Sequence, residues 1–195
     1  MRRKAFDVVL SATGLLLATV LLAASGLLFW ANSFISDNVR TQLTAQKVFI
    51  PEMSTHALDD PLIKPYLSKY AGQQLVNGDQ AKAYADHFIA VHLNKSSGGL
   101  TYSQLSAQAQ KAPDDTVLQG KVATAFKGET LRGLLLNAYA FGKMAQVAFV
   151  AAWISLASGL AFLVLGALGL MHARRTPQDA TVNVPGWHPE HQPAS

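Results

Sequence analysis

The sequence contains no cysteine among its 195 residues. This absence excludes disulfide bonds, thiolate metal ligands, cysteine nucleophiles and an N-terminal lipid-modified cysteine. Charged residues are also scarce, at 14% of the chain, whereas half of the residues are apolar. This composition is more apolar than an average soluble domain and more polar than a chain that lies wholly in a membrane, so we expect a mixed architecture.

The chain also lacks a basic stripe interleaved with aromatic residues, although its formal net charge is +4. Five of its 16 basic residues stand at two points, Arg2-Arg3-Lys4 and Arg174-Arg175, which flank two long apolar runs. Residues 31–146, between those runs, carry eleven basic and nine acidic side chains. Because the charge of this middle segment is nearly balanced, we expect no nucleic-acid partner.

Charges are absent from two long segments, residues 8–30 and 147–171, which contain 23 and 25 residues. At a helical rise of about 1.5 Å per residue, each segment can cross a hydrocarbon layer of about 30 Å. We therefore predict two transmembrane helices. For the first segment the alternative is a signal peptide cleaved near Ala23-Ala24-Ser25, but the apolar run continues past that site to Trp30, which favours a membrane span.

The basic clusters beside these runs set the orientation. Because Lys and Arg are retained on the cytoplasmic side, we expect a protein that spans the plasma membrane twice, with both termini in the cytoplasm. The predicted topology anchors are Arg2, Arg3, Lys4, Trp30, Trp153, Arg174 and Arg175, the two tryptophans belonging to an outer aromatic belt. The chain then consists of a cytoplasmic N-terminus (1–7), the first span (8–30), an extracytoplasmic domain (31–146), the second span (147–171) and a cytoplasmic, largely disordered tail (172–195).

Small residues recur at every seventh position along the second apolar segment. Such a series keeps one stripe of a helix flat, so that another helix can approach closely within lipid. The first segment has a similar series. The predicted helix-packing seam consists of Ala138, Ala145, Ala152, Gly159, Gly166 and Ala173 in the helix that contains the second segment, and of Ser11, Gly14, Ala18 and Ser25 in the first segment. The sequence leaves open whether the two stripes meet within one chain or between two chains.

No alternating strand pattern of useful length occurs in the sequence, so we predict an all-α fold. Helical spacing without proline continues beyond the apolar runs, through residues 33–48 and 130–146. We interpret these segments as two stalks that extend the transmembrane helices. The predicted architecture is therefore two transmembrane helices extended into stalks that carry a small helical extracytoplasmic domain.

Local signals predict the helices of this outer domain. Asn77-Gly78-Asp79 is predicted to be a turn with an N-cap, which precedes an amphipathic helix over residues 79–94. Thr101 and Gln104 form a capping box that opens the next helix. A further helix should start at Pro113 and end at Gly128, because glycine often terminates helices.

Two histidines lie in the stretch DHFIAVHL, residues 86–93. Helical metal sites place their ligands three or four residues apart, whereas His87 and His92 are five apart and diverge by about 140° around an α-helix. We therefore expect a partly buried, hydrogen-bonded His92 on the inward face and a solvated His87. A metal site would need a third ligand from elsewhere, such as His56 or Asp59-Asp60. We predict no catalytic residue, no metal site and no cofactor.

Three segments of the sequence resemble a known group of proteins. They read KYAGQQLVNGDQAKAYADHFIAVHL, TYSQLSAQA and LQGKVATAFKGETLRGLLLNAYAF. With most of residues 1–175, they resemble a family of small two-span membrane proteins from actinobacteria that has no assigned activity. The resemblance implies a helical protein of a bacterial inner membrane, and it implies no catalytic residues.

Together these features predict a non-enzymatic integral membrane protein. Neither span carries an ionisable residue in its interior, which argues against a channel or a pump. We expect an accessory or assembly factor whose partners are the lipid bilayer and either another membrane or envelope protein or a second copy of itself. The alternative is an extracytoplasmic small-molecule sensor that signals through a separate cytoplasmic partner. An enzyme, as a third reading, would need a site assembled around His92 or His56.

Overall fold

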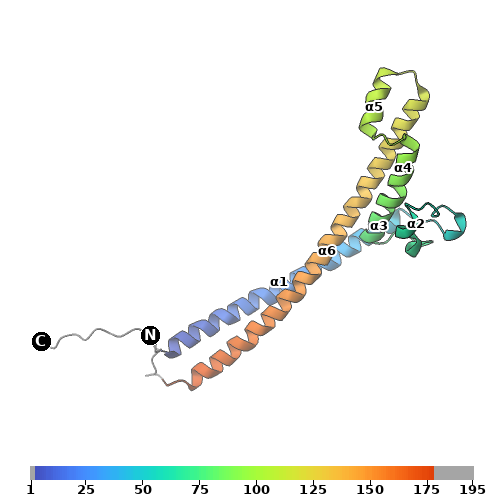
Figure 1. The fold of residues 1–195 in the computed structure, drawn as a ribbon. Coiled ribbons are helices and arrows are strands. Elements are labelled where there is room, and N and C mark those ends of the chain that lie inside the picture. Colours follow the sequence, from blue (N-terminus) through green and yellow to red (C-terminus); the bar gives the residue numbers. More distant parts are fainter. Residues whose placement is uncertain (1–2, 178–195) are drawn as a thin grey trace. The chain divides into compact units, whose positions relative to one another are not determined.

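The computed structural model describes residues 3–177, and every regular element in that range is a helix (Figure 1). In chain order the elements are α1 (Arg3–Ala45), the 3-10 helix η1 (Met53–Thr55), α2 (Lys64–Leu67), the 3-10 helix η2 (Ser68–Tyr70), α3 (Gly78–Ala83), the π-helix η3 (Tyr84–Ile89), α4 (Ala90–Ser97), α5 (Tyr102–Lys111) and α6 (Thr116–Arg175). Within residues 3–177, strand-like pairing is limited to an isolated bridge between Phe49 and Gln74. The predicted all-α class is confirmed.

The chain forms two compact units, which are described separately. We call residues 3–28 and 150–177 the hairpin unit, and residues 29–149 the helical unit. α1 and α6 contribute to both, and neither contains a proline. Each contains an 18-residue stretch with a mean hydropathy of 2.2, so both helices are long and apolar enough to cross a membrane.

In the hairpin unit, α1 and α6 run antiparallel. The N-terminal part of α1 lies against the C-terminal part of α6, where a Cβ atom added to Gly169 would meet the side chain of Ser11. Further along α1, the Ser25 hydroxyl donates a hydrogen bond to the Ala152 carbonyl over 3.0 Å. Most other side chains of this unit point outward.

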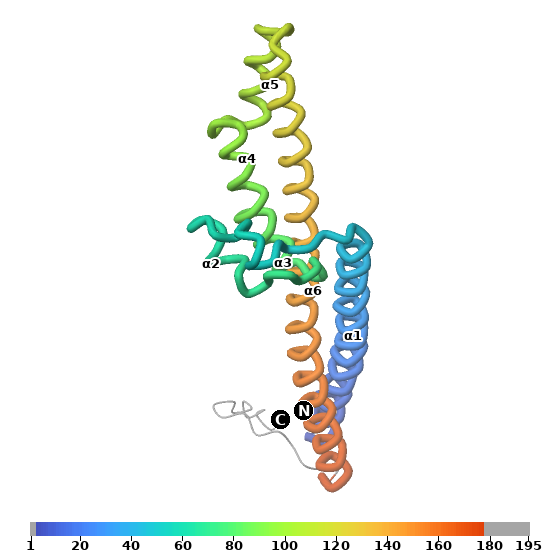
Figure 2. Tube along the Cα trace, turned by 90° about the vertical axis from the view of Figure 1, so that its right-hand side faces the viewer, coloured from blue at the N-terminus to red at the C-terminus, as the bar shows by residue number. Residues whose placement is uncertain are grey.

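In the helical unit, α4 lies beside α6, and α5 lies beside the first turns of α6 (Figures 1 and 2). The α5 contact is polar and aromatic, because the Tyr102 amide donates to the Glu129 carboxylate over 2.8 Å and its ring lies 5.4 Å from that of Phe126. The buried core of the unit comprises Val39, Leu43, Ile50, Leu58, Ile63, Leu67, Leu75, Ala81, Ala85, Ile89 and Leu135. These residues come from both long helices and from the segment that connects α1 to α4.

Both predicted helix caps are present in the helical unit. The Asn77 side chain accepts a hydrogen bond from the Gln80 amide at the start of α3. Thr101 and Gln104 form the reciprocal capping box of α5. These caps satisfy amide groups that have no partner within the helix. Each cap therefore fixes where its helix begins.

The helix predicted over residues 79–94 is longer than expected and is not uniformly α-helical. It runs from Gly78 to Ser97 and contains a six-residue π-helix, Tyr84–Ile89. A π-helix has i→i+5 hydrogen bonds and holds more residues per turn, so it rotates the residues that follow relative to a continuous α-helix. His92 is hydrogen-bonded as expected, to the Phe88 carbonyl, but it is exposed whereas His87 is half-buried, so the predicted burial of both histidines is wrong.

The predicted helix end at Gly128 is wrong. α6 passes through Gly128 and continues without interruption to Arg175. The glycine serves packing instead, because a Cβ atom at this position would lie 2.4 Å from Cδ2 of Leu93 and 2.8 Å from its Cγ. The missing side chain thus provides space for the leucine of the neighbouring helix.

Candidate functional site

The predicted seam residues of the hairpin unit lie between its two helices. Ala18 and Ala152 are fully buried, and Ser25 is 2% exposed. The hydroxyl of Ser11, a further buried seam residue, donates to the Asp7 carbonyl over 2.7 Å within α1. The two stripes of small residues meet within one chain, which the sequence left open.

Glycines provide the closest approach in this seam. A Cβ atom at Gly166 would lie 2.8 Å from Cγ of Leu15, and one at Gly159 would lie 3.0 Å from Cγ of Leu22. A Cβ atom at Gly14 would be 3.9 Å from Cα of Gly166, which is ordinary contact. The leucines of α1 therefore fill the space that the glycines of α6 leave. Ala173, at the end of α6, is 2% exposed.

Two predicted seam residues, Ala138 and Ala145, belong to the helical unit. Ala145 is 2% exposed, and its carbonyl accepts a hydrogen bond from the Asn32 side chain over 2.8 Å. Ala138 is half-buried against the core, where its carbonyl oxygen lies 3.0 Å from the Cβ position of Gly78. The small residues of α6 thus contact α1 at Asn32 and the start of α3 at Gly78.

The described anchor residues are mostly exposed. Arg3, Arg174 and Arg175 are exposed and Lys4 is half-buried, whereas Arg2 lies outside the described residues. Trp30 is exposed and stacks on Phe34 with ring centroids 5.4 Å apart. The last of the set, Trp153, is exposed in the hairpin unit. Arg3 and Arg174 lie at the same end of the hairpin unit because its helices are antiparallel.

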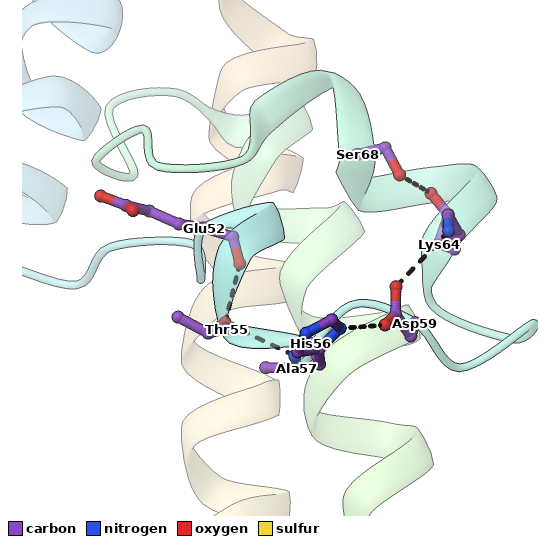
Figure 3. A network of polar contacts seen from close by, with 7 residues as sticks. All are labelled: Glu52, Thr55, His56, Ala57, Asp59, Lys64 and Ser68. Atoms are coloured by element: carbon purple, nitrogen blue, oxygen red, sulfur yellow. Dashed lines mark hydrogen bonds and ion pairs between the residues drawn. The ribbon is translucent and has the colours of Figure 1, made fainter.

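His56 and Asp59, which were considered as metal ligands, belong to a local polar network before α2 (Figure 3). The Nδ1 atom of His56 donates to the Asp59 carboxylate over 2.7 Å, and Lys64 donates to the other carboxylate oxygen over 3.4 Å. These hydrogen bonds hold the pKa of Asp59 below its usual value. The network orders an exposed turn, and no group of three metal-ligating side chains occurs within residues 3–177.

The adjacent Asp60 also has a structural partner. Its carboxylate pairs with Lys95 of α4 and accepts the Leu62 amide over 2.8 Å. Both hydrogen bonds keep the pKa of Asp60 below its usual value. This pair connects the segment before α2 to α4, so Asp60 acts as a turn residue with a longer-range ion pair.

Asp86 is the centre of a charge cluster on the π-helix. Its carboxylate pairs with Lys82 one turn earlier and with Arg132 of α6, whose Nη2 lies 3.0 Å from Oδ1 of Asp86. Burial acts to raise the pKa of Asp86, but the hydrogen bonds and charges of the two cations outweigh it and the pKa is lowered. The cluster ties the π-helix to α6.

His87 of the π-helix packs on Tyr66 of α2. The two rings are nearly parallel, with centroids 3.4 Å apart and an interplanar angle of 3°. This contact explains why His87 is half-buried. The π-helix is therefore connected to α2 by a ring stack and to α6 by the ion pair between Asp86 and Arg132.

A groove lies between the π-helix with α4 on one side and α6 on the other. It has a volume of about 510 Å³. One wall is an aromatic ladder, in which the ring centroids of Tyr84 and Phe88 are 4.8 Å apart and those of Phe88 and His92 are 4.4 Å apart. The opposite wall is formed by one face of α6, which presents Lys127 and Leu131.

Sequence reasoning missed this groove, although one signal for it exists. Tyr84, Phe88 and His92 follow one another at steps of four, which places aromatic rings along one helical face. The opposite wall was hidden because the sequence was divided into two helices at Gly128. A helix that ended at Gly128 would place Lys127 and Leu131 in different elements, so nothing in the sequence predicted that they lie on one face.

Comparisons of this chain with protein-family models, with curated proteins and with solved structures yield no match.

Proposed function

We propose that this chain is a non-enzymatic integral membrane protein of the plasma membrane, in which residues 8–30 and 147–171 are the spans. The observation that carries this proposal is the outward orientation of the apolar side chains. In the apolar 18-residue stretch of α1 only 17% is buried within the protein, and in that of α6 only 11% is buried. Water strongly disfavours so much contiguous apolar surface, whereas lipid accommodates it.

The topology proposed is cytoplasmic for both termini and extracytoplasmic for the helical unit. Its support is the basic end of the hairpin unit, where Arg3 and Lys4 of α1 stand near Arg174 and Arg175 of α6. Positive residues beside a span are retained in the cytoplasm. The segments of α1 and α6 beyond the spans then serve as stalks.

The absence of cysteine allows a direct test of this topology, because each introduced cysteine is unique. A membrane-impermeant maleimide added to intact cells should label Gln119→Cys in the helical unit and should not label Thr176→Cys. After lysis both variants should react, which controls for accessibility. Labelling of Thr176→Cys alone on intact cells would contradict the proposal.

We infer that the helical unit acts as an accessory or assembly factor by contacting another membrane or envelope protein. The support is the exposed apolar surface of α6 in this unit, which includes Leu134, Phe141 and Met144. A photoreactive phenylalanine analogue placed at Phe141 should crosslink one reproducible partner in native membranes, while the same analogue at Gln119 should not. Recovery of the uncrosslinked chain alone from both positions would argue against a partner.

A small-molecule receptor is the second candidate function, and the groove between α4 and α6 favours it. α6 runs without a break from Lys127 in the groove to Arg175. A ligand that shifts this helix would therefore act on a continuous element that reaches the proposed cytoplasmic side. Such a receptor would need a separate cytoplasmic partner to transmit the signal.

A further inference from the structure

The groove between α4 and α6 has the properties of a binding site for a small apolar molecule. Its volume of about 510 Å³ falls within the range of roughly 300–1,000 Å³ that is typical of ligand sites. Its walls are mainly aromatic and aliphatic, with Tyr84 and Phe88 on one side and Leu131 on the other. Apolar walls with few polar groups favour a ligand whose body is a hydrocarbon.

The charged groups of the groove select the polar end of such a ligand. Lys127 lines the groove and forms no ion pair with any residue of the described range 3–177. No acidic residue lines the groove. The carboxylate of Asp60, which interacts electrostatically with His92, is already paired with Lys95. An anionic ligand group beside Lys127 would therefore form an ion pair with the lysine without displacing a carboxylate of the protein.

The aromatic wall is fixed before any ligand arrives. The Nδ1 atom of His92 donates to the Phe88 carbonyl over 2.7 Å, which sets the orientation of the imidazole ring. Burial raises the pKa of the Tyr84 hydroxyl, so this ring stays uncharged. A preorganised wall reduces the entropy that is lost on binding.

The position of the groove along α6 identifies the source of the ligand. Gly128, which lines the groove, precedes Val147 by 19 residues, and at the helical rise this corresponds to about 28 Å. Along α6, this length exceeds the roughly 15 Å that one leaflet contributes to a hydrocarbon layer of about 30 Å, so we expect the chain of a phospholipid in the bilayer to fall short of the groove. This step rests on the proposed location of the second span, and it indicates a ligand that is free of the membrane.

We propose that this groove binds a monomeric long-chain carboxylate, with its hydrocarbon chain along Tyr84, Phe88 and Leu131 and its carboxylate at Lys127. The carboxylate accepts hydrogen bonds from the lysine ammonium, and the chain is removed from water by the aromatic ladder. No covalent step is involved. The receptor function of the helical unit would then depend on a fatty-acid-like signal.

The proposal can be tested by photolabelling of the full chain in nanodiscs of phosphatidylcholine. The probe is palmitate with a photoreactive diazirine near the end of its chain, and labelled peptides are mapped by mass spectrometry. We expect labels within residues 84–96 and 124–131, and we expect unlabelled palmitate to displace the probe more effectively than hexadecanol. Absence of labels from both segments would overturn the proposal.

Two matched pairs of variants separate the charge from the apolar body. Lys127→Gln should weaken competition by palmitate about three- to fivefold, as expected for a partly exposed ion pair. It should leave competition by hexadecanol unchanged. Lys121→Gln, on the same helix outside the groove, should change competition by neither compound. Leu131→Glu should reduce labelling at least about tenfold, whereas Leu134→Glu should not. Equal competition by palmitate and hexadecanol in the unmodified protein would exclude a carboxylate site.

A last experiment distinguishes a free carboxylate from the acyl chain of a membrane lipid. The same diazirine chain, esterified in phosphatidylglycerol within the nanodisc, should label the spans and not the groove. Equal labelling of the groove by this lipid would overturn the proposal of a free carboxylate. Failure of the proposed topology would instead appear in the maleimide labelling of Gln119→Cys, which does not depend on the groove.

Discussion

Asp86 shows how one carboxylate can hold an unusual helix in place. Its side chain is 21% exposed and is shared by Lys82 and Arg132, which come from two different helices. A π-helix is rare and occurs mostly as a single turn within an α-helix, so we expect tertiary contacts to stabilise it. The ion pair with Arg132 supplies such a contact at the point where the helix departs from α-helical geometry.

Asp86→Asn should lower the free energy of unfolding by about 1–2 kcal/mol at neutral pH, because two charge-assisted hydrogen bonds at a partly exposed site are weakened. The pKa of Asp86 is lowered from its ordinary value of 3.8. Its contribution is therefore complete above 3.8 and is lost as the pH falls through the lower folded-state pKa. The difference between the unmodified protein and the variant should shrink over that acid range.

This difference can be measured by thermal unfolding of the full chain in detergent, followed by circular dichroism at several pH values. Asp114→Asn is the matched control, since Asp114 is exposed and has no hydrogen bond or ion pair within residues 3–177. An equal loss of stability in both variants would show that the cluster at Asp86 is not special.

Ser25 provides a second single-residue test, because it is 2% exposed and donates across the hairpin unit to the Ala152 carbonyl. Ser25→Ala should cost only about 0.6 kcal/mol, the typical size of such a bond in a membrane. Ser25→Leu should cost about 1–3 kcal/mol through overpacking. Ala23→Leu, at an exposed position of the same helix, should be neutral in the same unfolding measurement; similar losses in both leucine variants would contradict a close-packed seam.

Single residues were predictable where the interaction is local in the sequence. Asn77 and the Thr101 capping box bond to amides within three residues, so a short motif identifies them. Arg132, the second partner of Asp86, is 46 residues away, and no local pattern indicates it. The positions of His87 and His92 were wrong for a similar reason, since one π-helical segment changes the face on which each later residue lies.

Two glycines inside α6 differ in whether their position has room for a side chain. Gly128 receives the Leu93 side chain, whereas a Cβ atom at Gly133 would meet nothing within 4 Å. Both residues look alike in the sequence, and glycine is a common helix terminator. The contact between Gly128 and Leu93 of α4 is a tertiary contact and is not visible in the local sequence.

We expect opposite effects from alanine at these two positions. Gly133→Ala should stabilise the full chain by about 0.5–1 kcal/mol, because alanine favours the helix and no atom is displaced. Gly128→Ala should lose this gain, since the new Cβ would collide with the body of Leu93 and not only with its tip. Thermal unfolding by circular dichroism measures both changes.

The combination Gly128→Ala with Leu93→Ala tests the cause. Removal of the leucine side chain takes away the obstacle, so the glycine substitution should be better tolerated in this background than alone. If Gly128→Ala is equally harmful with and without Leu93, the contact between α4 and α6 is not what requires the glycine.

The antiparallel hairpin unit brings the basic start of α1 and the basic end of α6 together. Arg3 begins α1 and Arg175 ends α6, so the charges that were read as separate signals along the sequence lie at one end of a single unit. The sequence could indicate both apolar segments from composition alone. It could not indicate that their small residues pack within one chain, because an intermolecular contact would use the same pattern.

The proposed topology depends on the charge of this common end and not on the shape of its side chains. Replacing Arg2, Arg3, Lys4, Arg174 and Arg175 together by Gln should therefore allow a mixed orientation, so that a membrane-impermeant maleimide labels part of the Thr176→Cys population on intact cells. The corresponding variant with Lys at all five positions keeps the charge and should leave Thr176→Cys unlabelled. Since the same apolar segments are present in both variants, a difference between them can only come from the charge. Complete protection of Thr176→Cys in the Gln variant would mean that the orientation is set by another feature of the chain.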